Sequence, residues 1–127
     1  MSDEVRTGRC LCGDVSYRVS GPLSGATACH CSQCRRQSGH VWAAADAPLD
    51  RVIIKGPVAW YAASPAAERG FCPRCGSFLF WKAPGTGLIE ISLGSLDMPT
   101  GVRLERHIFC ADKGDYYDIA DGLPQSP

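Results

Sequence analysis

Cysteine spacing constrains this chain more than any other feature of its sequence. Seven of the eight cysteines fall into three tight clusters. These are Cys10 with Cys12, Cys29 with Cys31 and Cys34, and Cys72 with Cys75. Cysteines this close together can turn their sulfurs toward one ion about 2.3 Å away, and a closed zinc site needs four such ligands. Three clusters therefore predict two zinc sites, with Cys110 standing alone downstream.

A disulfide framework is the main alternative for an even number of cysteines. The N-terminal segment, residues 1–9, is polar and has no apolar run that could act as a signal peptide. We therefore expect a cytoplasmic protein, in a compartment where thiols stay reduced. A chain of 127 residues also suits one domain, residues 1–127, that can bury a core without covalent staples.

A redox pair is the second alternative, because Cys72 and Cys75 are separated by two residues as in thioredoxin-like motifs. Such a pair should follow a strand and open a helix. Here the pair is followed by Gly76 and Ser77 and then by the apolar run 78–81, which has the composition of a strand. The pattern favours a zinc-binding turn.

Charge excludes several classes of partner. Thirteen basic residues balance thirteen acidic ones, so no overall field attracts a phosphate backbone or an anionic membrane. No stretch approaches the roughly 18 apolar residues of a membrane span. We expect neither a nucleic-acid nor a membrane partner. Arg35 and Arg36 form the densest positive cluster, and they either offset the charge of neighbouring thiolates or contact an anionic small substrate.

Short alternating segments rich in β-branched and aromatic residues, separated by glycine and proline, predict an all-β fold. The expected strands are residues 6–10, 15–19, 26–30, 41–45, 51–55, 59–62, 69–72, 77–82, 88–93 and 103–109. One short helix is expected over residues 32–38. It would place its N-terminal amides near Cys31 and Cys34 and favour their thiolate forms. The polar tail 121–127 should lie over the surface or fray.

The clusters differ in a way that predicts different roles. Cys10 and Cys12 precede Gly13, and Cys72 and Cys75 precede Gly76, so both pairs have the pattern of tight turns between strands. Together they predict one closed, structural zinc site. The cluster of Cys29, Cys31 and Cys34 supplies three ligands. Three protein ligands and an open fourth position are the arrangement of catalytic zinc sites.

A fourth protein ligand would instead close the second site. Cys110, His40 and His107 are the candidates, although Cys110 also fits an isolated buried cysteine. His30 alternates with Cys29 and Cys31 along a strand, so its side chain should point away from the metal that they bind.

Several motifs together resemble a known family. They are the segment 8–13, the segment 29–39 with its three cysteines, the segment 71–77, the segment 94–97 and the segment 106–109. In this order the chain resembles the glutathione-dependent formaldehyde-activating enzyme and centromere protein V family, from Gly8 to about Pro124. The resemblance implies a β-tent fold of zinc-pinned sheets. It also implies that Cys10, Cys12, Cys72 and Cys75 hold a structural zinc, and that Cys29, Cys31 and Cys34 hold a second, exchangeable one.

The family activity implied is the formation of S-hydroxymethylglutathione from formaldehyde and glutathione, a carbon–sulfur lyase reaction in reverse. Zinc would hold the glutathione thiol as a thiolate, and the aldehyde would be attacked by sulfur. A weak acid must then supply a proton to the developing alkoxide, and Asp97 and His107 are candidates from family-like motifs. Asp97 also fits a turn former, and His107 a buried structural histidine.

Two classes of function stay open at this point. The first is a zinc-dependent carbon–sulfur lyase acting on a glutathione–aldehyde adduct, with a small-molecule thiol and an aldehyde as partners. The second is a non-catalytic zinc module with two structural sites that binds a protein or a small molecule.

Overall fold

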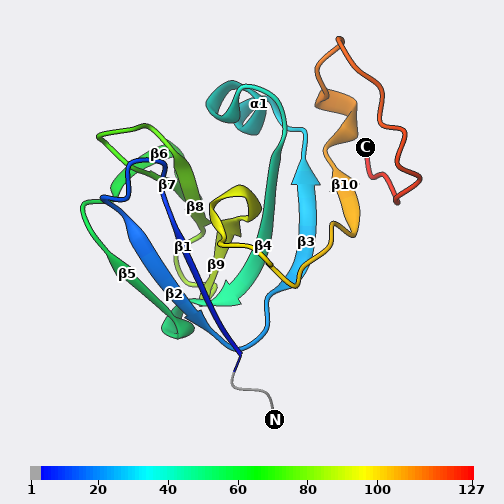
Figure 1. Ribbon diagram of the computed structural model, residues 1–127. Helices are drawn as coiled ribbons and strands as arrows, with labels where there is room; N and C mark the ends of the chain where they lie inside the picture. The colour runs from blue at the N-terminus through cyan, green and yellow to red at the C-terminus, as the bar shows by residue number, and fades with distance from the viewer. Residues whose placement is uncertain (1–3) are drawn as a thin grey trace.

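The computed structural model describes residues 4–127, so residues 1–3 of the polar N-terminal segment lie outside the described part. Two sheets form its frame (Figure 1). The small sheet has the order β1-β2-β5, and its strands are Val5–Arg9, Ser16–Ser20 and Val52–Lys55. The large sheet has the order β10-β3-β4-β9-β8-β7-β6. In that order its strands are Arg106–Ile108, Ser24–Cys29, Trp42–Pro48, Leu88–Ser92, Phe78–Lys82, Ala67–Phe71 and Ala59–Ser64.

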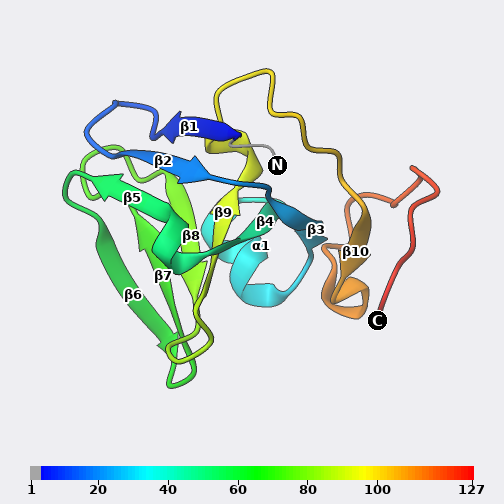
Figure 2. The ribbon, with the colours of Figure 1, turned by 90° about the horizontal axis from the view of Figure 1, so that it is seen from below.

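Alternation along the strands separates two faces of the large sheet. Gly70, Phe80, Ile91 and Ala45 lie side by side across β7, β8, β9 and β4. Their face packs against the small sheet, and Phe80 meets Tyr17 of β2 edge to face, with ring centroids 5.3 Å apart. The apolar core therefore lies between the two sheets, which Figure 2 shows one above the other.

The neighbouring row of residues points to the opposite face. Arg69, Trp81, Glu90 and Asp46 are paired across the same four strands. Because side chains alternate, these four residues leave the face that covers the main core. The single α-helix of the described residues, α1 (Ser32–Ser38), packs on this second face through Cys34, which contacts Trp42 and Ala44. A row with two carboxylates and one guanidinium beside a helix makes this face a candidate for chemistry.

Short helical turns and the chain end complete the fold. Three 3₁₀ turns span Leu49–Arg51, Leu93–Ser95 and Cys110–Asp112. The C-terminal tail pairs with β10: Gln125 lies beside His107 in a parallel bridge, and Cys110 N–H donates to the Ser126 carbonyl. The tail therefore covers the outer edge of the large sheet, a position that its polar composition did not reveal.

The all-β prediction is confirmed, and each expected strand has a counterpart. The expected helix 32–38 is observed with the same bounds. The largest difference is the last strand, predicted over 103–109 and observed only over Arg106–Ile108. It ends because Phe109 adopts a left-handed conformation with φ of 54°, which leaves the extended region. No helix in the part of the chain that the structure describes is long and apolar enough to cross a membrane.

Gly8 is enclosed by its cross-strand partner Tyr17 and by the 3₁₀ turn after β9, and it provides a test of the packing. A Cβ on Gly8 would lie 2.2 Å from the Tyr17 hydroxyl and 2.6 Å from the Ser95 carbonyl oxygen. We expect Gly8→Ala to destabilise the protein by about 1–3 kcal/mol, because the buried Tyr17 and the backbone must shift.

Chemical denaturation measures this loss, and Gly94→Ala is the matched control, since its Cβ would meet nothing closer than 4.0 Å. Equal stability of the two variants would contradict the packing described here.

Candidate metal centres and active-site cavity

Two hairpin turns bring the first cysteine group together. Cys10 and Cys12 lie in the turn between β1 and β2, and Cys72 and Cys75 lie in the turn between β7 and β8. The turns share one pattern of backbone hydrogen bonds. Cys10 N–H donates to the Val15 carbonyl and Cys72 N–H to that of Ser77, while Gly13 and Gly76 close each turn on the first cysteine's carbonyl. Both glycines have positive φ, 86° and 81°.

The sulfur positions fit a zinc ion. Cys10 Sγ and Cys12 Sγ are 3.6 Å apart, and Cys12 Sγ and Cys72 Sγ are 3.7 Å apart. A disulfide needs about 2.05 Å, whereas four sulfurs at about 2.3 Å from one tetrahedral ion lie about 3.8 Å from one another. Cys10 and Cys72 are buried, and all eight cysteines, which fall within residues 4–127, are free thiols. The donor set therefore fits a closed four-sulfur zinc site.

The second cysteine group lies where β3 meets α1. Cys29 ends β3, Cys31 is the N-cap of α1, and Cys34 lies in its first turn. The Cys34 amide donates to Cys31 Sγ at 3.3 Å, so the helix start contributes to the group as the sequence predicted. The three sulfurs lie within 4.8 Å of one another, and no fourth Cys, His, Asp or Glu of residues 4–127 joins them within that distance.

Four residues were considered as a fourth ligand, and all of them lie outside the group: Cys110, His40, His30 and His107. Cys110 begins the 3₁₀ turn after β10. His40 is exposed and bonds the Tyr116 hydroxyl at 3.0 Å. His30 and His107 bond each other, His30 Nε2 to His107 Nδ1 at 2.8 Å, and His30 also bonds Tyr117.

His107 is buried in a row of hydrogen-bonded side chains away from the three cysteines. Its Nε2 donates to Asp121 Oδ2 at 2.7 Å, which leaves Nδ1 to accept from His30. Burial lowers the pKa of His30, and the neighbouring His107 lowers it further. The chain of hydrogen bonds ties the C-terminal segment to β3 and β10, and the lowered pKa of His30 favours the neutral form of that ring.

A buried arginine carries positive charge to the second cysteine group. Arg69 of β7 is 5% exposed, and its Nη1 donates to Cys34 Sγ at 3.6 Å. The Cys29 thiol also donates to Cys34, which lowers the pKa of Cys34 to about 6 and raises that of Cys29. Arg69 adds to the lowering at Cys34. The Cys29 thiol and the Arg69 guanidinium therefore both favour the thiolate form of Cys34.

The three cysteines open into a cavity of about 490 Å³. Trp42 and Trp81 form an aromatic wall, and Ile108 at the end of β10 and Phe109 just after it add apolar surface. The rest of the lining comes from Ser32, Gln33, Ser64, Ala66, Ala67, Arg69, Ala83, Glu90 and Asp112. Arg69 is the one basic side chain in this lining within residues 4–127. A cavity of this size, mostly apolar with few polar groups, is typical of small-molecule sites.

Glu90 is the half-buried acid of the cavity. It lies opposite Trp81 on β8 and Asp46 on β4. Burial, together with the negative charges of Asp46 and Cys34, raises the pKa of Glu90 to about 7 against the opposing effect of Arg69. A carboxyl group with this pKa exists in both protonation states near neutral pH, which suits a proton donor and acceptor.

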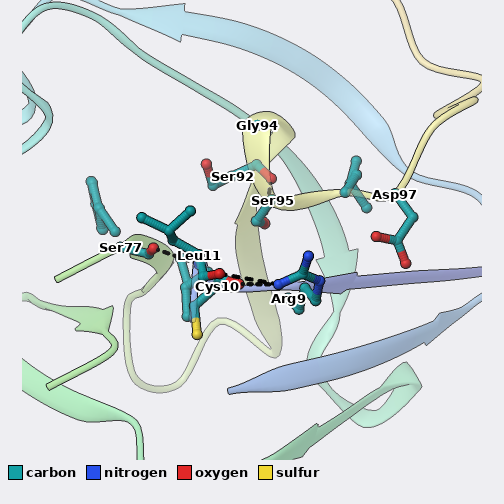
Figure 3. A pocket seen from close by; sticks show the side chains of 11 residues that line it. Arg9, Cys10, Leu11, Ser77, Ser92, Gly94, Ser95 and Asp97 are labelled. Atoms are coloured by element: carbon teal, nitrogen blue, oxygen red, sulfur yellow. Dashed lines mark hydrogen bonds between the residues drawn. The ribbon is translucent and has the colours of Figure 1, made fainter. Parts of the chain in front are cut away.

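Asp97 lies at a different cavity. Figure 3 shows it with Arg9, Cys10 and Ser95 around a hollow of about 460 Å³ beside the first cysteine group. Asp97 accepts a hydrogen bond from the Thr7 hydroxyl at 2.6 Å, and its amide bonds the Thr7 carbonyl. It therefore ties the segment after β9 to β1, and neither Asp97 nor His107 lines the cavity of the second cysteine group.

Arg35 and Arg36 also lie outside the cavity lining. They occupy the last turn of α1, where Arg36 is exposed and Arg35 is partly buried. Positive charge at a helix C-terminus is favourable for the helix dipole. The structure thus brings the three cysteines together but does not bring these arginines to the cavity.

Three residues of the cavity were not found from the sequence: Arg69, Glu90 and Trp42. Glu90 left a weak signal, because it is a charged residue between Ile89 and Ile91 in a predicted strand, whereas Arg69 follows the charged Glu68 at the start of its predicted strand. A charged residue of this kind faces either solvent or a polar site. Which of the two it faces depends on which side of the sheet the helix covers, and the sequence does not show this.

The comparisons with known proteins agree with this geometry. A family model described as glutathione-dependent formaldehyde-activating enzyme matches residues 5–112, and the chain belongs to this family. A Schizosaccharomyces pombe protein named as an uncharacterized lyase is 26% identical over 116 residues, which cover 90% of this chain and 85% of that protein. The crystal structure of a Rhodobacter sphaeroides protein matches with a TM-score of 0.60 and 27% identity, covering 76% of this chain and 90% of that one.

Substitutions in the two cysteine groups should have different effects on stability. We expect Cys72→Ser to abolish most of the cooperative folding, because it leaves three ligands at a site that ties two hairpins in the core. Cys29→Ser should lower stability much less, because its group lies on one face of a sheet that is already assembled.

Thermal unfolding of both zinc-loaded variants measures the difference, with Cys110→Ser as the control outside both groups. A loss for Cys29→Ser as large as that for Cys72→Ser would contradict the division into structural and open sites.

Proposed function

We propose that this protein is a carbon–sulfur lyase that makes and breaks the adduct of a thiol and an aldehyde. The observation that carries the proposal is the cavity in which three cysteine sulfurs, with no fourth protein ligand among residues 4–127, share a wall with a half-buried carboxyl group. Membership of the family and the lyase name of the S. pombe relative support this class of reaction.

The three cysteines suit a zinc ion with one free coordination position. Cys29, Cys31 and Cys34 would hold it, and a bound zinc ion would supply a position at which an outside thiol stays deprotonated near neutral pH. Cys10, Cys12, Cys72 and Cys75 would hold a second, purely structural zinc. We infer two zinc ions per chain, with the one in the cavity the more easily lost, because three protein ligands bind a metal less tightly than four.

Glu90 is the proton donor and acceptor in this proposal. During synthesis the thiolate sulfur attacks the aldehyde carbon, a carbon–sulfur bond forms, and the carbonyl π electrons move to oxygen. The protonated Glu90 then gives its proton to that oxygen. In the lyase direction the Glu90 carboxylate takes the hydroxyl proton, the carbonyl re-forms and the thiolate leaves. In this proposal Glu90 replaces Asp97 and His107, the candidates from the family-like motifs, because Glu90 lines the cavity.

Glutathione is the proposed thiol and formaldehyde the proposed aldehyde, as the family description indicates. The aromatic wall of Trp42 and Trp81 would shield the reacting atoms from bulk water. We also propose that the two sheets joined at the first cysteine group form the β-tent implied by the resemblance, and that the protein acts in the reducing cytoplasm.

The proposal is tested by exchange NMR of glutathione and formaldehyde with zinc-loaded protein. We expect the protein to accelerate interconversion of the free and adduct forms above the spontaneous rate. Glu90→Gln should reduce the acceleration about 10²–10⁴-fold, the usual contribution of a positioned proton donor. Glu68→Gln, on β7 but outside the cavity lining, should change little.

The pH dependence gives a second readout. Synthesis needs protonated Glu90, so the ratio of wild-type to Glu90→Gln rates should fall as the pH rises through about 7. The ratio for the lyase direction should fall over the same range, because a catalyst accelerates both directions of a reaction by the same factor at a given pH. Full activity in Glu90→Gln would exclude this role, and no acceleration by the wild-type protein would favour a non-catalytic zinc module.

A further inference from the structure

Arg69 is a buried cation in an unusual environment. The side chain is 5% exposed, and its guanidinium donates to Gln33 Oε1 at 3.0 Å, Gln37 Oε1 at 3.3 Å and Cys34 Sγ at 3.6 Å. None of the ion pairs within residues 4–127 includes it. Removing an unpaired charge from water costs several kcal/mol, so a buried arginine needs a negative counterpart. Cys34 is the one acidic group among its three hydrogen-bond acceptors.

The charge balance of the second cysteine group supplies that counterpart. Three thiolates and one divalent ion sum to one negative charge, and an added thiolate makes this two. A neutral fourth ligand such as water or imidazole leaves the sum at one. The guanidinium therefore stabilises the state with an outside thiolate more than the state with a neutral ligand, and the buried setting strengthens this difference.

A second observation also indicates that the group accepts an anion. The indole N–H of Trp42 is buried beside the cysteines and has no acceptor among the described residues. Trp42 lies directly opposite Cys29 across β3 and β4, and it stacks on Phe78 with ring centroids 4.1 Å apart. The Arg69 guanidinium lies over the Phe78 ring, with its Cζ atom 5.5 Å from the ring centroid. The Trp42 indole N–H and the Arg69 guanidinium are thus two hydrogen-bond donors beside the three sulfurs.

We propose that Arg69 is a positioning residue that makes the open position of the second cysteine group select an anionic sulfur ligand over neutral ligands. This inference rests on the proposed function, because it requires a metal with a free position at Cys29, Cys31 and Cys34. It assigns to this site one ligand class, the thiolate, and one residue that determines the preference.

The position of the Arg69 guanidinium is linked to the first cysteine group. Arg69 is on β7, which ends at Phe71 and leads directly into Cys72 of the first group. Gly70 between them leaves no room for a side chain, since a Cβ there would lie 2.8 Å from the Trp60 ring. A strand held at its end by a metal and packed under an aromatic ring presents the guanidinium at a constant position.

A purely structural role for Arg69 is the competing explanation, since its bonds to Gln33 and Gln37 also hold α1 on the sheet. The two explanations differ in what they predict for ligands of different charge. A structural role affects every ligand of the metal alike, whereas charge selection affects thiolate binding alone.

The test is a pair of titrations of cobalt-loaded protein, one with 2-mercaptoethanol and one with imidazole at the same pH, followed by the visible absorption of the bound cobalt. We expect Arg69→Met to weaken 2-mercaptoethanol binding about 10–100-fold, the range for hydrogen bonds to charged groups. Imidazole binding should change less than about twofold. Arg69→Lys should restore most of the thiol affinity, because it restores the charge.

Lys82→Met is the matched control, because Lys82 is a cation on the neighbouring strand that lies over Trp60 at 4.1 Å and outside the cavity lining. Should Arg69→Met not fold, Arg69→Gln removes the charge while keeping a donor, and the same comparison applies. Equal weakening for both ligands, or unchanged thiol affinity, would overturn the inference. A wild-type protein that binds neither ligand would refute the open site itself, and with it the proposed function.

Discussion

The meeting of four sulfurs from two hairpin turns is the constraint on which the rest of the structure depends. Cys12 and Cys72 are 60 residues apart in sequence, and their sulfurs are 3.7 Å apart. Four thiolates at such distances would repel one another, and a metal at their centre would offset that repulsion. A metal bound there would join the β1–β2 hairpin of the small sheet to the β7–β8 hairpin of the large one. The core between the sheets forms around this joint.

The same strands that bury the core also build the cavity. Gly70 and Phe80 face the small sheet, while their neighbours Arg69 and Trp81 face α1 and the second cysteine group. Because adjacent side chains of a strand point to opposite faces, a one-residue shift of register would exchange core residues for cavity residues. A metal at the first cysteine group would therefore secure the register of β7 and β8, and with it the position of the groups proposed for chemistry.

The sequence was sufficient for features that depend on local spacing. Cysteine spacing predicted which sulfurs meet, and alternation with glycine turns predicted the strands and the helix 32–38. It was not sufficient for features that depend on how distant strands pair. Glu90 and Arg69 reach the cysteines because β4, β9, β8 and β7 are neighbours, an order that no local pattern encodes. Asp97 and His107 were candidates from motifs, and each makes a connection elsewhere, to Thr7 and to Asp121.

The central claim is that the two cysteine groups hold metal in different ways. The most direct test is a crystal structure of the zinc-loaded protein with glutathione, using diffraction data collected at the zinc edge. The account predicts two zinc peaks. One lies among Cys10, Cys12, Cys72 and Cys75, and the other among Cys29, Cys31 and Cys34 with the glutathione sulfur as fourth ligand. A second zinc closed by Cys110 or a histidine, or no metal at the three cysteines, would contradict it.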